Sequence, residues 1–259
     1  MNNELIVEQH GHIAWLTVNR PEVRNALSLS LTTGIAHALH ALSRDRSVRV
    51  FVLTGAGDRV FVSGADVREF REHLATAESA LKYDARAEEL QSALRQVPQP
   101  VIAMIQGHAV GSGTIVAASC DFRVAVRTAK FGIPVAKFGF LAPVPDTLRL
   151  VQLIGPARAK RMLMTGELIE APEALAIGLV DKVVDAESLR ATVEEMAATL
   201  ASNAPLTLKA TKQIIEGITA PASDVHAGAR WYGEIFSSSD FREGLDAFFA
   251  KRKPEFKGE

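Results

Sequence analysis

The chain lacks most of the features that place a protein in a special class. It has one cysteine, Cys120, among 259 residues, so no disulfide can form within it, and the apolar segment around Cys120 predicts a buried, unreactive thiol. The formal net charge of −1 gives no reason to expect nucleic acid or an anionic membrane as a partner. The sequence contains no run of about 18 consecutive apolar residues, the length that spanning a bilayer requires. The first residues, MNNELIVEQHG, lack both the basic start and the apolar core of a signal peptide, so we expect a soluble, cytoplasmic protein.

Familiar ligand motifs are also missing. His37 and His40 have no acidic or cysteine partner at metal-binding spacing, and no metal site is expected. The glycine-rich segment from Gly107 to Gly113, GHAVGSG, has neither the order G-x-G-x-x-G of a dinucleotide turn nor a lysine after its last glycine. Because 47% of the residues are apolar, the chain can nevertheless bury a large core.

The stretch from Val101 to Asp121 is the most informative part of the sequence. The apolar run Val101 to Ile105 predicts a buried strand, and the small residues from Thr114 to Ser119 predict a closely packed helix. The glycines between them form a turn. Such a turn leaves the first N–H groups of the helix unpaired, and the helix dipole adds partial positive charge. The turn therefore serves either close packing or the binding of a negatively charged atom.

A second stretch, from Phe61 to Phe70, repeats the order of strand, turn and helix. Asp66 with Glu69 three residues later has the pattern of a capping box, which predicts a helix start and places Ala65 at its mouth. Two helix N-termini in one chain can direct their N–H groups at a single oxygen atom. The pair favours a binding site over two unrelated packing turns.

These stretches belong to a pattern that resembles the enoyl-CoA hydratase/isomerase (crotonase) superfamily almost from end to end. The matching segments are NRPEVRNAL (19–27), VFVSGADVREF (60–70), PQPVIAMIQGHAVGSGTIVAASCDFRVA (98–125), AKFGIPVAKFGF (129–140), LIGPARAKRMLMTGE (153–167), ALAIGLVDKVV (174–184) and SSDFREGLDAFFAKRKPEF (238–256). The resemblance implies an α/β fold of the crotonase-like (ClpP/crotonase) type. It implies a spiral of ββα units with an acyl-CoA site over residues 1–200 and a C-terminal helical trimerisation region over residues 201–259. A homotrimer, or a dimer of such trimers, is the expected assembly.

The resemblance also implies the parts of an active site. The N–H groups of Ala65 and Ser112 would form an oxyanion hole that polarises a thioester carbonyl and stabilises an enolate. Ser112 stands where the family usually has glycine, and its backbone donor survives unless the position needs a positive φ. Coenzyme A enters as part of an acyl-CoA thioester substrate, and no separate cofactor is expected. The implied substrate-binding residues are Arg24, Ala26, Ser63, Asp66, Val67, His108, Gly111, Ile115, Val135, Phe248 and Lys251.

The basic tail, AKRKPEFKG, has two interpretations. It could be a solvated run of charge. In the family, positions that match Phe248 and Lys251 reach from one subunit to a coenzyme A bound by its neighbour. The loop NRPEVRNAL and the turn around Ser63 and Asp66 would supply backbone contacts to adenine and pantetheine.

The sequence departs from the family at the residues of the reaction itself. Hydration of an enoyl thioester needs an activated water and a proton delivered to Cα, a task for two carboxylates. The family's two glutamates correspond to Ile115 and Val135 in this chain. Aliphatic side chains can neither activate water nor transfer a proton, so the usual hydratase pair is absent although the oxyanion hole is retained.

Three functions remain open on these residues. The first is an enzyme that combines the oxyanion hole with Asp146, Lys137 or His108 for isomerisation, decarboxylation, thioester hydrolysis or a specialised hydration. The second is a conventional hydratase whose water is activated by another group. The third is a non-catalytic acyl-CoA-binding protein, which an apolar pocket would suit. Decarboxylation needs an enolate and no general base, so it loses least from the missing pair.

Each of the three polar candidates also has a structural interpretation. Asp146 follows two prolines and precedes a helix expected to begin near Thr147, so a role as its N-cap ranks ahead of catalysis. His108 fits a loop imidazole bonded to the backbone, and Lys137 an exposed or helix-end ammonium.

Periodicity and turn residues predict the other elements. We expect a hairpin over 4–9 and 12–18, a helix from Ser28 or Ser30, strands over 50–54, 122–126 and 179–184, a solvated helix over 73–94, and helices over 187–201, 205–217 and 221–237.

Overall fold

A six-stranded sheet forms the centre of the fold, and the computed structural model describes it within residues 4–73, 77–138, 141–219 and 238–259. Its order is β1 (Leu5–His10), β2 (Ile13–Val18), β3 (Val50–Gly55), β5 (Val101–Ile105), β7 (Phe122–Val126) and β10 (Lys182–Val184). The first two strands form the expected antiparallel hairpin, and the other neighbours pair in parallel. Strands β3 and β5 are buried along their whole length, as their continuous apolar sequences require.

A smaller four-stranded sheet lies in the order β4 (Val60–Val62), β6 (His108–Val110), β8 (Lys130–Gly132) and β9 (Ile169–Glu170). The consecutive strands β3 and β4, β5 and β6, and β7 and β8 each place one strand in the large sheet and the next in the small sheet. Helices follow these pairs, so the predicted repetition of ββα units is confirmed.

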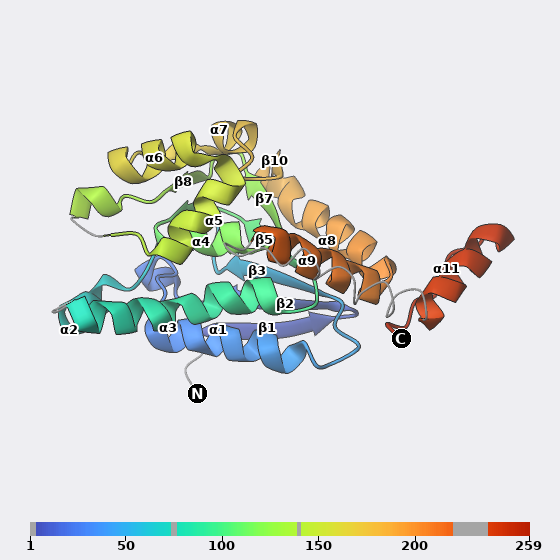
Figure 1. The fold of residues 1–259 in the computed structure, drawn as a ribbon. Coiled ribbons are helices and arrows are strands. Elements are labelled where there is room, and N and C mark those ends of the chain that lie inside the picture. Colours follow the sequence, from blue (N-terminus) through green and yellow to red (C-terminus); the bar gives the residue numbers. More distant parts are fainter. Residues whose placement is uncertain (1–3, 74–76, 139–140, 220–237) are drawn as a thin grey trace.

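The helices cover the sheets and surround a central helix, α4. Figure 1 shows α1 and α3 side by side along the lower part of the molecule, with α5 above α4 and α11 outside the main body. Their bounds are α1 (Leu29–Leu42), α2 (Phe70–His73), α3 (Ala77–Gln96), α4 (Ser112–Ser119), α5 (Val144–Ile154), α6 (Pro156–Thr165), α7 (Ala171–Ala176), α8 (Ala186–Ser202), α9 (Pro205–Thr219) and α11 (Ser239–Ala250). Three 3-10 turns are η1 (Pro21–Val23), η2 (Val67–Glu69) and η3 (Val135–Phe138).

Helix α1 forms where its sequence predicts it. Ser28 is the N-cap, and its hydroxyl accepts a hydrogen bond from the N–H of Leu31 at 3.2 Å. Leu31, Ile35 and Leu39 recur at helical spacing and are buried in the core. Local capping and periodic burial together fix this helix.

Two predicted elements differ from the structure. The solvated helix expected over 73–94 is α3, and its buried Leu90 and Leu94 show that one face belongs to the core. The strand expected over 179–184 begins only at Lys182, because the N–H groups of Leu179 and Val180 donate to the carbonyl of Ala174 in a turn. The helix expected over 221–237 lies outside the described residues.

Two further predictions, the lack of a membrane-spanning helix and the burial of Cys120, can be compared with the structure. Within the described ranges, no helix combines the length and the apolar character that crossing a bilayer demands. The thiol of Cys120 is fully buried and donates to the carbonyl of Val116 at 3.3 Å. The prediction of a buried cysteine is confirmed, and burial raises the pKa of this thiol to about 12, which favours its protonated form.

Candidate active site

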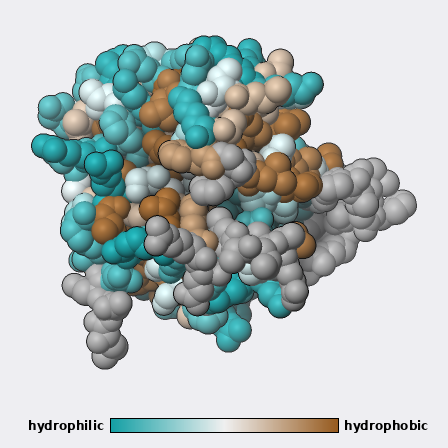
Figure 2. Space-filling view, turned by 90° about the vertical axis from the view of Figure 1, so that its left-hand side faces the viewer, coloured by the Kyte–Doolittle hydropathy of each residue, from teal (hydrophilic) through white to brown (hydrophobic). Residues whose placement is uncertain are grey.

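A pocket of about 520 Å³ lies between α3, α4, α5 and the turns before α2 and α4. Leu81 and Leu141, which are 71% and 88% exposed, stand at its rim. Figure 2 looks at this end of the molecule and shows hydrophobic side chains gathered in the middle of the face, with a mainly hydrophilic upper part. An apolar entrance of this kind suits a ligand with a hydrocarbon portion.

The two predicted turns meet at one wall of the pocket. A Cβ built on Gly111 would lie 3.6 Å from the Cα of Gly64, and one built on Gly64 would lie 3.9 Å from the N atom of Ser112. Both glycines have positive φ, 121° at Gly64 and 57° at Gly111, which other residues rarely adopt. The backbones of the two turns are therefore in direct contact, and Ala65 and Ser112 line the same cavity.

The backbone geometry leaves two N–H groups available at this wall. Ala65 forms a parallel β-bridge with Leu27. The N–H of Leu27 donates to the carbonyl of Gly64 at 2.9 Å, and the N–H of Asp66 donates to the carbonyl of Leu27 at 2.8 Å. The N–H of Ala65 thus points away from Leu27. Ser112 is the first residue of α4, where an N–H has no partner within the helix.

Helix α4 is held against the small sheet by its smallest residues. A Cβ on Gly113 would lie 2.1 Å from the carbonyl oxygen of Val62, so only glycine fits. The hydroxyl of Thr114 donates to the carbonyl of Ala109 at 2.7 Å and accepts from the N–H of Gly132 at 3.2 Å. These contacts explain the run of small residues in the sequence and fix the direction of the Ser112 N–H.

Ile115 and Val135 both line the pocket. Ile115 lies on α4 with 2% of its surface exposed, and Val135 begins η3 and packs against the core. The two positions where the resemblance expects carboxylates are thus apolar walls of the cavity.

Asp146 does not occupy the N-cap position that the sequence suggests for it. Helix α5 begins at Val144 with Pro143 at its N-cap, so the prediction that Asp146 caps a helix starting near Thr147 is wrong. Pro145 is tolerated in the first turn, where its missing N–H costs nothing. Asp146 therefore falls inside that first turn, half-buried, and lines the pocket.

The environment of Asp146 changes its protonation. Burial, assisted by the negative charges of Glu88 and Asp84 and opposed by Arg95, raises the pKa of the Asp146 carboxyl to about 7. A carboxyl group with this pKa is present in both protonation states near neutral pH. It can accept a proton and return it, which is what general acid–base catalysis requires.

Sequence reasoning missed the polar residues that α3 contributes to the pocket. Asp84, Tyr83 and Gln91 all line it. Burial raises the pKa of the Asp84 carboxyl, and it also raises the pKa of the Tyr83 phenol, which stays protonated. The charged residues of this segment had suggested a solvated helix, and the only available signal was the helical spacing of these positions.

The other predicted substrate-binding residues of the N-terminal half surround the same turns. Arg24 is exposed with a φ of 56°, Ala26 is buried, Ser63 is half-buried and Val67 is 68% exposed. Asp66 is buried and accepts hydrogen bonds from Arg20 and Arg68. The guanidinium of Arg68 holds the pKa of the Asp66 carboxyl well below its usual range.

The capping box predicted for Asp66 and Glu69 is half right. Asp66 is the N-cap of η2 and accepts from the N–H of Arg68 at 3.2 Å. Glu69 instead accepts from the N–H of Leu29 at 3.0 Å, at the start of α1. Glu69 therefore ties the two helix starts together instead of closing a box with Asp66.

Of four further candidates, three lie away from the pocket lining, and the side chain of the fourth lies outside the described residues. His108 is exposed and its Nδ1 accepts from the N–H of Lys130 at 3.2 Å, so the expected bond to the backbone is confirmed, but the residue begins β6 and does not lie in a loop. Lys137 is exposed on η3. Lys251 is exposed just after α11, and the side chain of Phe248 lies outside the described residues.

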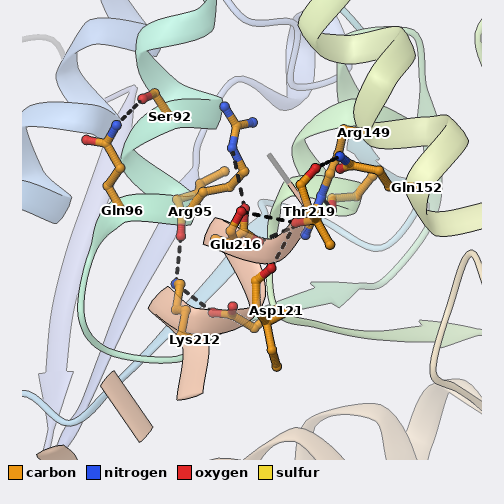
Figure 3. Close-up of polar contacts among 12 residues, drawn as sticks. Ser92, Arg95, Gln96, Asp121, Arg149, Gln152, Lys212, Glu216 and Thr219 are labelled. Atoms are coloured by element: carbon orange, nitrogen blue, oxygen red, sulfur yellow. Dashed lines mark hydrogen bonds and ion pairs between the residues drawn. The ribbon is translucent and has the colours of Figure 1, made fainter. Parts of the chain in front are cut away.

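A network of charged residues links the helices that form the pocket walls (Figure 3). Arg149, one turn after Asp146 on α5, donates from Nε to the carbonyl of Ala118 near the end of α4 at 2.8 Å. Its Nη1 lies 3.2 Å from Glu216 on α9, and Glu216 also faces Arg95 on α3. Helix α9 thereby fixes α3 and α5 relative to the helix that carries Ser112.

No metal site accompanies these residues. Among the described residues, no three His, Cys, Asp or Glu side chains are grouped so that they could hold a metal ion.

Comparison with known proteins gives a consistent result. The family model described as enoyl-CoA hydratase/isomerase matches residues 8–259. The chain is 38% identical to a short-chain-enoyl-CoA hydratase of Clostridium acetobutylicum, over 98% of this chain and 97% of that protein. It is 36% identical to a crotonyl-CoA hydratase of Syntrophomonas wolfei, over 97% of each. A crystal structure of an enoyl-CoA hydratase/carnithine racemase from Magnetospirillum magneticum superposes with a TM-score of 0.95 at 37% identity, covering 100% of this chain and 97% of that one.

Proposed function

Because the chain belongs to the enoyl-CoA hydratase/isomerase family, we propose that it moves a proton on the acyl group of a CoA thioester, with Asp146 as the proton-carrying group. The observation that supports this role is the Asp146 carboxyl in the pocket wall, with its pKa raised to about 7. It supplies the acid–base chemistry that Ile115 and Val135 cannot provide.

In the proposed reaction the thioester carbonyl oxygen accepts hydrogen bonds from the N–H groups of Ala65 and Ser112. These bonds strengthen as negative charge develops on the oxygen, which makes the Cα proton easier to remove. The Asp146 carboxylate takes a proton from Cα of a 3-enoyl thioester and forms a dienolate. The Asp146 carboxylic acid then returns the proton to Cγ, and the double bond moves into conjugation with the carbonyl. One carboxyl group is sufficient for this isomerisation.

Hydration is the second candidate, and a specific observation favours it. Asp84 lines the same pocket as Asp146, so two carboxyl groups are available, one to activate water and the other to deliver a proton. The relatives named above are hydratases by name. In hydration by this pair, the two carboxyl groups would come from α3 and α5. In the family's usual arrangement they come from the positions that match Ile115 and Val135.

Three thioesters separate the possible reactions. Isomerisation of 3-hexenoyl-CoA creates a conjugated thioester and raises its absorbance, whereas hydration of crotonyl-CoA removes that absorbance. A malonyl-type thioester would release carbon dioxide if the oxyanion hole acted alone. We expect turnover of 3-hexenoyl-CoA. Binding of all three thioesters without any product would support the non-catalytic alternative and reject the proposal.

Replacing Ser112 with proline tests the oxyanion hole directly. Proline is well tolerated at the first position of a helix, and it removes the N–H while leaving the fold of α4 intact. We expect kcat to fall by about 10²–10³-fold, the usual effect of losing one oxyanion donor. Ser112→Ala keeps the N–H and is the control, with kcat near that of the wild type. Equal activities of the two variants would argue against a role for this N–H.

A further inference from the structure

Helix α3 presents two polar residues, Asp84 and Gln91, to the pocket along one face, with Ala87 between them. Asp84, Ala87 and Gln91 line the cavity at the helical spacing i, i+3, i+7, so they form a single stripe. Asp146 reaches the same cavity from α5. Most other lining residues are apolar, including Leu90, which neighbours Gln91. The polar stripe is therefore a local feature of one wall.

Gln91 is the unusual member of this stripe. Only 4% of its surface is exposed, and its Oε1 atom is buried without a hydrogen-bond partner among the described residues. Gln96, farther along α3, is exposed and donates to the hydroxyl of Ser92 at 2.8 Å. A buried acceptor without a donor destabilises a fold, and native proteins rarely keep one unless a ligand or water supplies the donor.

The position of Gln91 in the pocket indicates which part of a ligand would meet it. Leu81, on the same helix and at the rim, is 71% exposed, whereas Gln91 is 4% exposed, so Gln91 lies in an enclosed part of this wall. Ala65 and Ser112, which would hold the thioester, are only half-buried. A group that reaches Gln91 thus lies farther inside than the thioester, on the acyl chain.

We propose that this wall recognises an acyl group that carries a hydroxyl at the end of its chain, away from the thioester, with Gln91 Oε1 accepting a hydrogen bond from that hydroxyl. The inference rests on the proposed function, because it takes the pocket as the site of the acyl group. A hydroxyl supplies the donor that Gln91 lacks.

The charges in the pocket argue against a carboxylate at the same place. Asp84 and Asp146 both line the cavity, and both are partly buried. A third carboxylate in this confined space would meet like charge with little water to screen it. A neutral hydroxyl avoids this repulsion, so the pocket should separate hydroxylated acyl groups from both plain and carboxylated ones.

Calorimetry with three saturated thioesters of the same chain length tests the proposal. Hexanoyl-CoA, 6-hydroxyhexanoyl-CoA and adipoyl-CoA differ only in the end of the acyl chain, and none has a double bond to react. We expect 6-hydroxyhexanoyl-CoA to bind about tenfold more tightly than hexanoyl-CoA, the effect of one added hydrogen bond to a buried acceptor. Adipoyl-CoA should bind more weakly than hexanoyl-CoA.

Two variants assign the effect to Gln91. Gln91→Leu should bind the hydroxylated and plain thioesters equally and should unfold at a higher temperature without ligand, because it removes the unpaired acceptor. Gln96→Leu alters the exposed part of the same helix and should keep the tenfold preference. The rise in unfolding temperature also verifies that Gln91→Leu is folded.

Each remaining outcome contradicts the proposal. Equal binding of hexanoyl-CoA and 6-hydroxyhexanoyl-CoA by the wild type, or a preference that survives in Gln91→Leu, would overturn the recognition by Gln91 while leaving the proposed function intact. Tightest binding of adipoyl-CoA would show that the wall selects a carboxylate instead. Failure of all three thioesters to bind would reject the proposed function itself.

Discussion

Replacement of Asp146 with asparagine is expected to lower kcat by about 10²–10⁴-fold, the range that general acid–base groups contribute. Asparagine has nearly the same size and shape but cannot accept or return a proton at any accessible pH. Because the pocket walls are unchanged, the dissociation constant for a saturated acyl-CoA should stay close to that of the wild type. Steady-state kinetics with 3-hexenoyl-CoA and calorimetry with hexanoyl-CoA measure the two effects separately.

The same substitution should make the protein more stable above neutral pH. Since the pKa of Asp146 is raised from an ordinary value near 3.8 to about 7, folding disfavours its ionised form. The resulting loss of stability is absent below the unfolded pKa, grows as the pH rises through this interval, and is complete above pH 7. A shift of this size corresponds to at most about 4 kcal/mol, and less for a half-buried group.

Thermal unfolding at pH 5 and pH 8 provides the measurement. The advantage of Asp146→Asn over the wild type should be several degrees larger at pH 8 than at pH 5. Asp58→Asn changes an exposed carboxylate outside the pocket and serves as the control for an Asp-to-Asn substitution. An Asp146→Asn variant that retains wild-type kcat would remove Asp146 from the mechanism, whatever its stability.

Replacement of Lys212 with methionine should be the most destabilising of the changes considered. Lys212 is 8% exposed, and its ammonium donates to the carbonyls of Leu94 (2.8 Å) and Gln99 (3.2 Å) and to Asp121 (2.7 Å) (Figure 3). Breaking a buried ion pair by removing one partner costs about 3–5 kcal/mol, because the remaining charge loses its compensation. Denaturation in urea would measure this loss of unfolding free energy.

Two further variants separate the ion pair from the loss of the side chain. Lys160→Met removes an exposed lysine on α6 and should change the unfolding free energy by less than about 0.5 kcal/mol. Asp121→Asn in the Lys212→Met background removes the uncompensated charge while keeping an oxygen to accept from the N–H of Val101, so part of the stability should return. A Lys212→Met variant as stable as Lys160→Met would contradict the assigned role.

Much of the fold could be predicted from local sequence because local rules act alone there. The hairpin turns at Gly11, which has a φ of 60°, and α1 begins at a serine that caps it. The contact of Gly64 with Gly111 required knowledge of the family, because residues far apart in the chain make it.

Two site residues could not be placed from sequence, for identifiable physical reasons. Two prolines before Asp146 suggested that the helix starts after them. Pro145 instead fits the first turn of α5, so the helix starts at Val144 and Asp146 lies within its first turn and not at its N-cap. Gln91 falls in the segment 73–94, which the sequence predicts to be a solvated helix. Its burial follows from tertiary packing, which the local pattern of α3 does not encode.

The direct contact between the two glycine turns has a consequence for how this scaffold can change over time. The proposed anion site consists of main-chain groups, so substitutions at positions such as 115, 135 and 146 can alter the walls without removing the donors. Binding of a thioester and the fate of its acyl group are thus encoded by separate parts of the sequence. A lineage, or a designer, can exchange one reaction for another by single substitutions while the anchoring of the substrate is inherited unchanged.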